Sequence, residues 1–354
     1  MSASRLTWLA AALLLAVLLA ACGGPAASSA ATATSAPPTA TRPPATATPV
    51  PTSTPVPTAT LPPPTPTPAP PTATPTPAEP QAGATRVWPV DGMVQVYIPA
   101  GEFIMGSEDI EAKRTEKGGR AYPEVPQHTA YTDAFWIDKY EVTNAQYALC
   151  LNAGVCPPLH LNSSETREHY FDNPEYADYP VIWVSWYMAK TYCEWAGRRL
   201  PTEAEWEKAA RGTDGRKYPW GNDPVDGTRA NFCDRNCPRK ALANYLYDDG
   251  YADTAPVGSY PKGASPYGVM DMAGNVWEWT STIIKPYPYD PNDGREDPDV
   301  YAERVWRGGT WSNGTWWLRA SVRYRSIPSY WNVNLGFRCA ASVDAPLPTA
   351  TASP

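Results

Sequence analysis

The pattern of hydrophobic and polar positions divides the chain into parts of different character. An unbroken apolar run covers residues 6–21, and a segment without large apolar side chains follows it to about residue 85. From residue 86 to about 343 apolar and polar positions are interleaved, and this part holds every Tyr and Phe and every Trp except Trp8. Its length of roughly 260 residues is enough for one substantial hydrophobic core.

The first elements of this region follow from local signals. Val94–Ile98 and the following residues 99–106 predict a β-hairpin, and residues 134–137 predict a short aromatic strand. Thr143 and Gln146 have the spacing of a capping box, in which each side chain bonds the backbone of the other residue. We therefore expect a helix from this point to about Leu151.

Two further helices are predicted in the middle of the chain. Ser185 can cap a helix that Gly197 ends. One face of it carries Trp186, Ala189, Cys193 and Ala196. Thr202 and Glu205 form another capping box and begin a helix that extends to Gly212.

After Gly212 the pattern predicts short strands and turns, with no good helix. Gly, Pro, Asn and Asp are frequent there, and the whole chain has 15 Trp and 21 Tyr but only 5 Phe. Indole N–H and phenol O–H groups can bond irregular backbone while their rings fill a core. The sequence therefore predicts a loop-rich α+β domain at residues 86–343.

The N-terminal residues have the pattern of an export signal. Residues 1–21 carry one positive charge, an apolar run and small residues at its end, which is typical of a secretory signal peptide. The run ends in Leu-Ala-Ala-Cys, which resembles the lipobox of bacterial lipoproteins, where cleavage leaves a lipid-bearing Cys22. The alternative is an ordinary signal peptide with an incidental Cys. The prediction is an extracytoplasmic protein that lipid anchors to the cell membrane.

Residues 22–85 form a predicted linker made almost only of Pro, Thr, Ala, Ser and Val. Such a segment cannot bury enough apolar surface to fold, and its repeated Thr-Pro steps favour extended polyproline II. It is either a stalk that lifts the domain from the membrane or a spacer without another role. Residues 344–354 resemble it and are predicted to be disordered. The net charge of −7 argues against a nucleic-acid partner.

Six Cys remain if Cys22 carries lipid. An even number in an exported chain suggests disulfides, although six Cys allow fifteen pairings. Cys150 with Cys156, and Cys233 with Cys237, flank short turn-prone stretches that suit local bridges, which leaves Cys193 and Cys339 for each other. The alternative for Cys233 and Cys237 is half of a zinc site, but no second Cys/His pair of suitable spacing follows.

Several segments together resemble the formylglycine-generating enzyme, or sulfatase-modifying factor, family. They are residues 98–107 (IPAGEFIMGS), 137–144 (IDKYEVTN), 184–186 (VSW), 198–207 (RRLPTEAEWE), 218–221 (YPWG), 267–279 (YGVMDMAGNVWEW), 307–311 (RGGTW) and 336–339 (GFRC). The resemblance implies the family's fold, a variant of the C-type-lectin-like architecture with little regular secondary structure. It also implies a disulfide between Cys193 and Cys339.

The resemblance fails at the catalytic centre. Family enzymes oxidise a Cys of a sulfatase peptide with O₂, using copper held by two thiolates, and soft thiolates select Cu(I). These positions fall on Asn313 and near Leu318, and no Cys lies between Cys237 and Cys339. Copper is therefore not expected. An iron site built from His128, His160 and His169 is a weak alternative, because the histidines of iron-binding relatives lie largely in an additional domain absent here.

The family's calcium sites are better represented. The resemblance implies a first site of Asn231, Phe232, Asp249 and Tyr251 and a second of Asp271, Gly274, Val276 and Glu278. Mixed carboxylate, amide and backbone oxygens suit Ca²⁺, whose expected role is to hold loops in place. The alternative is that Asp249 and Asp271 only shape turns.

Aromatic residues crowd the segment around the lost thiolates: Trp311, Trp316, Trp317, Tyr324, Tyr330 and Trp331. They form either a groove for a peptide, protein or glycan at the cell surface, or part of the core. Three functions follow from the sequence. The first is a membrane-anchored binding module, the second an oxidoreductase or protein-modifying enzyme with a different metal centre, and the third a structural envelope protein.

Overall fold

The computed structural model describes residues 79–108 and 124–348. The predicted signal peptide, Cys22 and all but the end of the predicted linker lie outside these residues. Within them, no helix is long and apolar enough to span a membrane. The predicted domain start at residue 86 falls inside the first strand, because residues 83–87 complete a sheet: the N–H of Gly83 bonds the carbonyl of Tyr97. Residues 344–348 of the predicted tail are also described, and the Ala345 N–H bonds Ser342.

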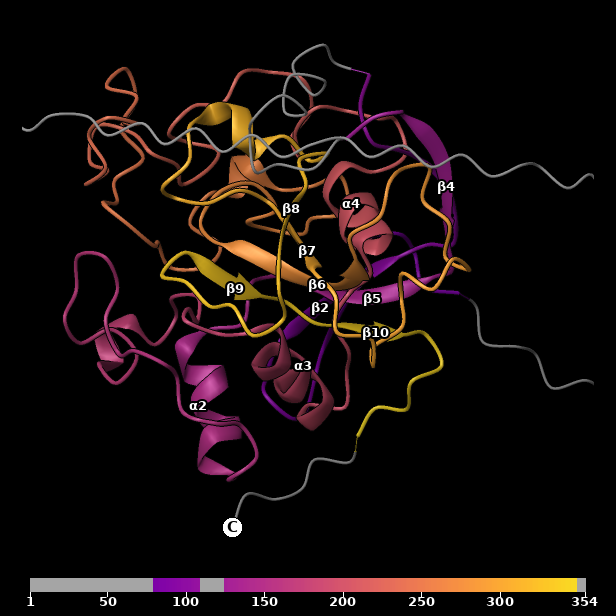
Figure 1. Ribbon diagram of the computed structural model, residues 1–354, viewed down its shortest axis with the longest axis horizontal. Coiled ribbons are helices and arrows are strands. Elements are labelled where there is room, and N and C mark those ends of the chain that lie inside the picture. Colours follow the sequence, from indigo (N-terminus) through magenta and orange to yellow (C-terminus); the bar gives the residue numbers. More distant parts are fainter. Residues whose placement is uncertain (1–78, 109–123, 349–354) are drawn as a thin grey trace, which may run out of the picture. The chain divides into compact units, whose positions relative to one another are not determined.

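The strands form three sheets (Figure 1). The strands are β1 (Thr85–Val87), β2 (Val94–Ile98), β3 (Gly101–Met105), β4 (His128–Thr132), β5 (Phe135–Asp138), β6 (Trp277–Ile283), β7 (Arg304–Arg307), β8 (Tyr324–Ser326), β9 (Leu335–Phe337) and β10 (Ala340–Ser342). The first sheet has the order β1-β2-β5-β10, the second pairs β3 with β4, and the third has the order β8-β7-β6-β9. Only β6 and β9 pair in parallel among these strands. The strand predicted at residues 134–137 is β5, and the first sheet contains strands from both the beginning and the end of the domain, at its opposite edges.

The hairpin predicted at residues 94–106 is wrong, although both of its strands exist. β2 pairs with β1 on one side and β5 on the other, so it has no free edge for the segment that follows it. β3 pairs instead with β4, which places Phe103 opposite Ala130. Local turn chemistry suggested the hairpin, and long-range pairing overrode it.

The three predicted helices are present with the predicted caps. They are α2 (Asn144–Asn152), α3 (Trp186–Trp195) and α4 (Glu203–Arg211). Thr143 and Thr202 form capping boxes with Gln146 and Glu205, and the Ser185 side chain accepts from the N–H of Met188. Each cap bonds helix N–H groups that otherwise lack a partner, which is why these starts could be predicted to the residue.

Three disulfides fasten this loop-rich domain, and they are the predicted ones: Cys150–Cys156, Cys193–Cys339 and Cys233–Cys237. The second joins α3 to the segment between β9 and β10 across 146 residues. The predicted apolar face of α3 is buried, from Trp186 to Ala196, against the same core. The core therefore lies between α3 and the sheets, where Figure 1 shows α3 beneath the third sheet.

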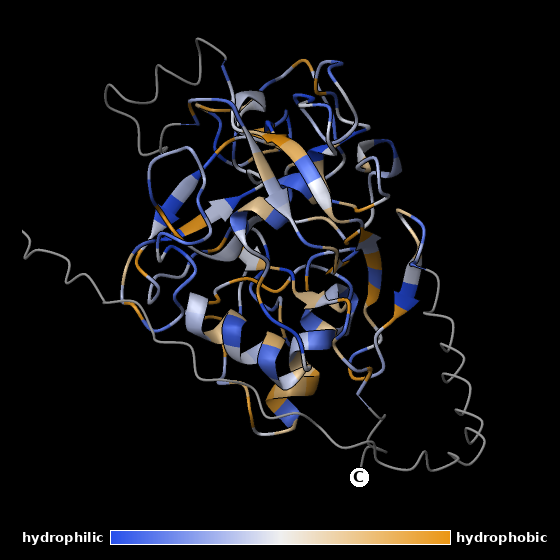
Figure 2. Cartoon of the chain, turned by 90° about the vertical axis from the view of Figure 1, so that its right-hand side faces the viewer, coloured by the Kyte–Doolittle hydropathy of each residue, from blue (hydrophilic) through white to orange (hydrophobic). Residues whose placement is uncertain are grey.

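All nine residues of α4 are buried, including its charged ones. Glu203 accepts from Arg323 and lies 2.9 Å from Arg307, while Glu207 accepts from Arg307 and Arg211. The pKa of Glu207 is lowered, because Arg307 and Arg211 outweigh the opposing effect of burial. Figure 2 shows hydrophilic and hydrophobic residues interleaved along the helices and strands, as this charged interior requires. Buried charges are tolerated when they are paired in this way.

Candidate functional site

A groove of about 560 Å³ lies on the third sheet and includes Asn313, one of the two positions that the family resemblance assigned to copper ligands. Its walls come from β6, β7, β8, the turn after β7, the loop before β9 and the loop after Cys237. The lining residues are Arg239, Leu242, Trp277, Trp306, Ser312, Asn313, Trp317, Tyr324, Arg325, Ser326, Tyr330, Asn332 and Asn334. Segments far apart in the sequence therefore build this site.

The aromatic wall of the groove is a set of rings packed on one another. Trp306 stacks on Tyr324 and on Tyr330, with ring centroids 5.1 and 5.4 Å apart. Trp277 lies 5.8 Å from Tyr324, and Trp317 meets the Trp277 ring edge-on at 6.2 Å. Such packing makes the wall rigid before any ligand arrives, which reduces the entropy lost on binding.

Two polar atoms of the wall have no hydrogen-bond partner. The indole N–H of Trp306, a side chain only 5% exposed, donates to nothing in the described structure, and the side-chain oxygen of Asn313 accepts from nothing. A buried polar group without a partner costs about 1–3 kcal/mol. One unsatisfied donor and one unsatisfied acceptor thus belong to residues of the same wall.

The charge of the groove is opposite to that of the whole chain. Its described lining contains two guanidinium groups, Arg239 and Arg325, and no carboxylate. Arg239 lies over the Trp311 ring at 5.2 Å. The Cys233–Cys237 disulfide closes the turn that precedes Arg239, and the Cys233 N–H bonds the Asn313 carbonyl, so the disulfide fixes this loop beside the groove.

The two former copper positions differ in the structure. Asn313 is half-buried and lines the groove, whereas Leu318 is fully buried in a cluster with Phe232 and Tyr218. All six Cys of the described residues are in disulfides. The residues present therefore do not fit a copper ion held by thiolates.

The aromatic residues that the sequence offered for a groove lie in different places. Trp317, Tyr324 and Tyr330 line it, but Trp311 is buried, with 1% of its surface exposed. Trp316 is not a lining residue and stacks on Arg319 instead. Trp331 packs on His160, with ring centroids 4.6 Å apart, and is also outside the groove.

Sequence reasoning missed most of the wall. Trp277 belongs to a segment noted only for its family resemblance, Trp306 directly precedes another such segment, and Asn332, Asn334 and Arg239 belong to loops with no motif. Each of the two Trp lies between a Val and a charged residue, so no clear alternation marked them as groove residues. No local signal indicates the loop residues, because their position depends on chain folding.

The first calcium set has a feature that fits a cation. The Asn231 side-chain oxygen is buried without a hydrogen-bond partner, while its amide N–H groups donate to Asp253 and Asn275. The Asp249 carboxylate accepts from the N–H groups of Phe232 and Tyr251, which draws the predicted ligands together. Burial raises the pKa of Asp249 to about 7, so a nearby cation would relieve the cost of its charge.

The second calcium set is less suited to a cation. Both carboxylate oxygens of Glu278 accept from Arg338, and one also accepts from the Trp206 indole. Asp271 accepts from the Gly258 N–H, and burial raises its pKa to about 6. Among the described residues, no group of three or more His, Cys, Asp or Glu is arranged to hold a metal. Each predicted calcium set has fewer than three such side chains, because its other ligands are amide or backbone oxygens.

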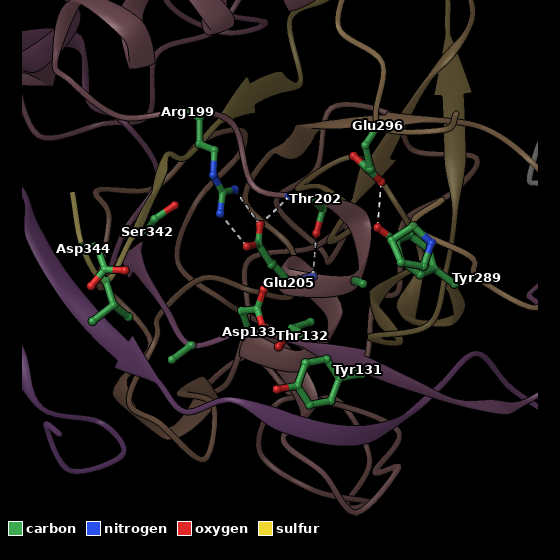
Figure 3. Close-up of a pocket in the computed structure, with 14 residues that line it drawn as sticks. Tyr131, Thr132, Asp133, Arg199, Thr202, Glu205, Tyr289, Glu296, Ser342 and Asp344 are labelled. Carbon is green, nitrogen blue, oxygen red and sulfur yellow. Dashed lines mark hydrogen bonds and ion pairs between the residues drawn. The ribbon is translucent and has the colours of Figure 1, made fainter. Parts of the chain in front are cut away.

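A second cleft, of about 520 Å³, has the opposite character (Figure 3). It lies at the start of α4 and carries Asp133, Glu205, Glu296 and Asp344 with one guanidinium, that of Arg199. Its Arg199, Glu205 and Glu296 side chains have partners: Arg199 holds Glu205 through two hydrogen bonds, and Glu296 accepts from three hydroxyl groups. Unlike the groove, the described lining of this cleft contains no buried side-chain atom without a hydrogen-bond partner.

Comparison with known proteins identifies the family of this fold. A sequence model described as the sulfatase-modifying factor enzyme 1-like domain matches residues 81–343. A formylglycine-generating enzyme of Streptomyces coelicolor is 35% identical over 297 residues, which cover 71% of this chain and 90% of that protein. A Mus musculus protein named inactive C-alpha-formylglycine-generating enzyme 2 is 38% identical over 292 residues, 71% of this chain and 86% of that protein.

The solved structure of PvdO from Pseudomonas aeruginosa is similar with a TM-score of 0.57 and 26% sequence identity, covering 75% of this chain and 100% of that one. The expected α+β fold is thereby confirmed. From the match across the whole domain, the chain belongs to the sulfatase-modifying factor, or formylglycine-generating enzyme, domain family.

Proposed function

We propose that this protein is a binding module, with the family's groove retained and its copper chemistry lost. The observation that carries the proposal is Asn313, which lines the groove where the family places a copper thiolate. The second thiolate position, Leu318, lies in the core. A groove with a rigid aromatic wall and unsatisfied polar atoms remains suited to holding an extended ligand.

The proposed ligand is a peptide segment of a protein at the cell surface. A peptide offers an N–H and a carbonyl at every residue, and the groove holds an unpaired donor at Trp306 and an unpaired acceptor at Asn313. A relative 38% identical to the chain is named an inactive formylglycine-generating enzyme, which supports the loss of the oxidase activity proposed here.

Two measurements on the full chain test this function. The first incubates it aerobically with copper and a Cys-containing sulfatase peptide, followed by mass spectrometry, and no formylglycine is expected. The second measures binding on peptide and glycan arrays. Asn313→Trp should fill the groove and abolish array binding, while Asn292→Trp, at an exposed turn position, should leave it unchanged.

Formylglycine formation by the purified chain would establish the alternative, an oxidoreductase or protein-modifying enzyme with a different metal centre. Array binding that survives Asn313→Trp would place the binding surface elsewhere. An absence of binding to every array would favour a structural envelope protein.

We infer that Ca²⁺ stabilises the domain at Asn231 and Asp249, with backbone oxygens of Phe232 and Tyr251. The unpartnered Asn231 oxygen supports this set. A ligand that binds only the folded state stabilises it by about 2.7 kcal/mol at a hundredfold excess over its dissociation constant. Millimolar Ca²⁺ should therefore raise the unfolding temperature of the wild type but not of Asp249→Asn. An equal rise in both would exclude this set.

We further propose that lipid on Cys22 anchors the protein at the outer side of the cell membrane, and that residues 22–85 act as a spacer. Three disulfides in the domain suit an oxidising compartment. Cys22→Ser should release the protein from the membrane fraction, as measured by fractionation of cells. Retention of this variant on the membrane would contradict the anchor.

A further inference from the structure

We propose that the groove selects an acidic peptide, whose carboxylates bind Arg239 and Arg325. This inference rests on the proposed function, because it names the ligand class of the same groove. The described lining has two guanidinium groups and no carboxylate, whereas the chain as a whole has a net charge of −7. A site of one charge sign within a surface of the other attracts and orients ligands of complementary charge.

Both guanidinium groups are held at the rim by ion pairs that a ligand can replace. Arg239 lies 3.5 Å from Glu165, with side chains 38% and 33% exposed. Arg325 lies 3.0 Å from Glu303, with side chains 37% and 43% exposed. Exposed pairs of this kind add little stability, so a carboxylate brought in by a bound peptide can take the place of either glutamate.

The interior of the groove suits a peptide backbone between these two ends. Asn313, Asn332 and Asn334 present amide groups, which pair well with peptide N–H and carbonyl groups. The unpartnered Trp306 N–H adds a donor for a peptide carbonyl. Leu242, 57% exposed at the rim, offers contact to an apolar side chain of the same peptide.

The arrangement of rings favours a peptide over a glycan. A sugar ring packs its C–H face on an open, flat aromatic face. Here the Trp306 ring is stacked on both Tyr324 and Tyr330, and Tyr324 also lies against Trp277, so these faces are largely covered by one another. What the wall offers is ring edges, hydroxyls and amides, which suit hydrogen bonding to an extended chain.

The experiment measures binding of three fluorescent pools of 12-residue peptides to the full chain. The pools share their Leu, Tyr, Ser and Ala positions and differ only in three positions that are Glu, Gln or Lys. The Glu pool should bind about tenfold more tightly than the Gln pool, and added salt should reduce this difference by screening. The Lys pool should bind more weakly than both.

Four variants localise the effect. Arg239→Gln combined with Arg325→Gln should remove the preference for the Glu pool, so that the Glu and Gln pools bind this variant equally. Glu303→Gln and Glu165→Gln remove the competing carboxylates and should each tighten binding of the Glu pool, which a merely structural role would not do. Arg216→Gln, from an exposed pair with Asp214 outside the groove, is the matched control and should change nothing.

Each outcome is informative. Equal binding of the Glu and Gln pools, still abolished by Asn313→Trp, would overturn the acidic specificity and leave the proposed function intact. Binding of glycans but of no peptide pool would overturn the peptide. Tighter binding of the Lys pool would reverse the assigned charge.

Discussion

The buried charges around α4, which we call the α4 framework (Glu203, Glu207, Arg307 and Arg323), differ from the polar groups of the groove in how fully they are paired. Around α4, Arg307 bonds Glu207, the Tyr287 hydroxyl and two backbone carbonyls, and Arg323 holds Glu203. In the groove, the Trp306 N–H has no partner, although only 5% of the residue is exposed. Around α4 every carboxylate of Glu203 and Glu207 has an arginine partner, although the Arg307 Nε has none, whereas the groove wall leaves the Trp306 N–H and the Asn313 side-chain oxygen unpaired.

The difference separates the residues that hold the fold from those available to a ligand. A charge network with its own partners contributes to one specific packing and has little left to offer a ligand. An unsatisfied donor in a concave wall lowers stability until something binds it. Changes in the framework should therefore affect unfolding, and changes in the groove should affect binding.

Replacing Cys193 and Cys339 by Ala should give the largest loss of stability. This disulfide closes 146 residues between α3 and the end of the third sheet, which the chain-entropy model values at roughly 4–5 kcal/mol. Urea unfolding under non-reducing conditions measures the free energy of unfolding. The control is the Cys150→Ala and Cys156→Ala pair, with a separation of 6, where about 2 kcal/mol is expected. Equal losses for both would show that loop closure is not the cause.

Replacing Arg307 by Met should cost about 3–5 kcal/mol of folding free energy, because it leaves Glu207 buried without one of its two arginine partners. Arg229→Met, from partly exposed pairs with Asp223 and Asp226, is the control and should cost less than about 1 kcal/mol. Urea unfolding measures both. A small effect of Arg307→Met would mean that the framework contributes less than its contacts indicate.

The free energy of unfolding should depend on pH through Asp138. Burial raises its pKa from 3.8 to about 6, against the opposing effect of Arg198. Because the folded state then binds more protons than the unfolded state between these values, the contribution of Asp138 is present at acidic pH and lost as pH rises from about 4 to 6. Asp138→Asn should therefore destabilise less at pH 7 than at pH 4, by up to about 3 kcal/mol.

The control for this pH effect is Asp226→Asn, because the pKa of the exposed Asp226 is lowered from its usual value by hydrogen bonds from Thr228 and by Arg229, against slight burial. Its effect should be constant between pH 5 and 7. Urea unfolding at several pH values provides the comparison. A constant effect of Asp138→Asn over the same range would show that Arg198 keeps Asp138 ionised.

The smallest predicted effect is the most direct comparison of the two regions. Trp306→Phe removes an N–H without a partner, whereas Trp279→Phe removes one that donates to the Val184 carbonyl at 3.1 Å. Both lose the same volume, so Trp279→Phe should cost more stability, by about 1 kcal/mol. For peptide binding the order should reverse, with only Trp306→Phe weakening it. The same order in both measurements would remove Trp306 from the binding site.

Much of the local structure could be predicted because it depends on neighbouring residues. The capping boxes at Thr143 and Thr202 determine where α2 and α4 begin, since each satisfies helix N–H groups within one turn. The apolar face of α3 follows from the helical period, and the two short disulfides follow from turn-prone spacing. The predicted hairpin failed for the complementary reason, because the partners of β2 are β1 and β5.

The site could be predicted from the sequence only at positions that belong to, or directly follow, a segment resembling the family. The absence of copper ligands at Asn313 and Leu318 is visible in the sequence. That Asn313 lines a groove while Leu318 joins the core is not, since Asn313 lies in the turn before η4 (Thr315–Leu318) and Leu318 is the buried last residue of that helix. Likewise, nothing local indicates that Arg239 and Asn334 meet in one wall.

The sequence by itself determined the helices, the disulfide partners, the family and the loss of the thiolates, because each is a matter of residue type and short spacing. Tertiary structure decided which charges of α4 have buried partners, which aromatic rings form the groove, and that two arginines line it while their partners Glu165 and Glu303 do not. These properties depend on contacts between segments far apart in the chain. Their energies come from burial, and burial is known only once the segments have packed together.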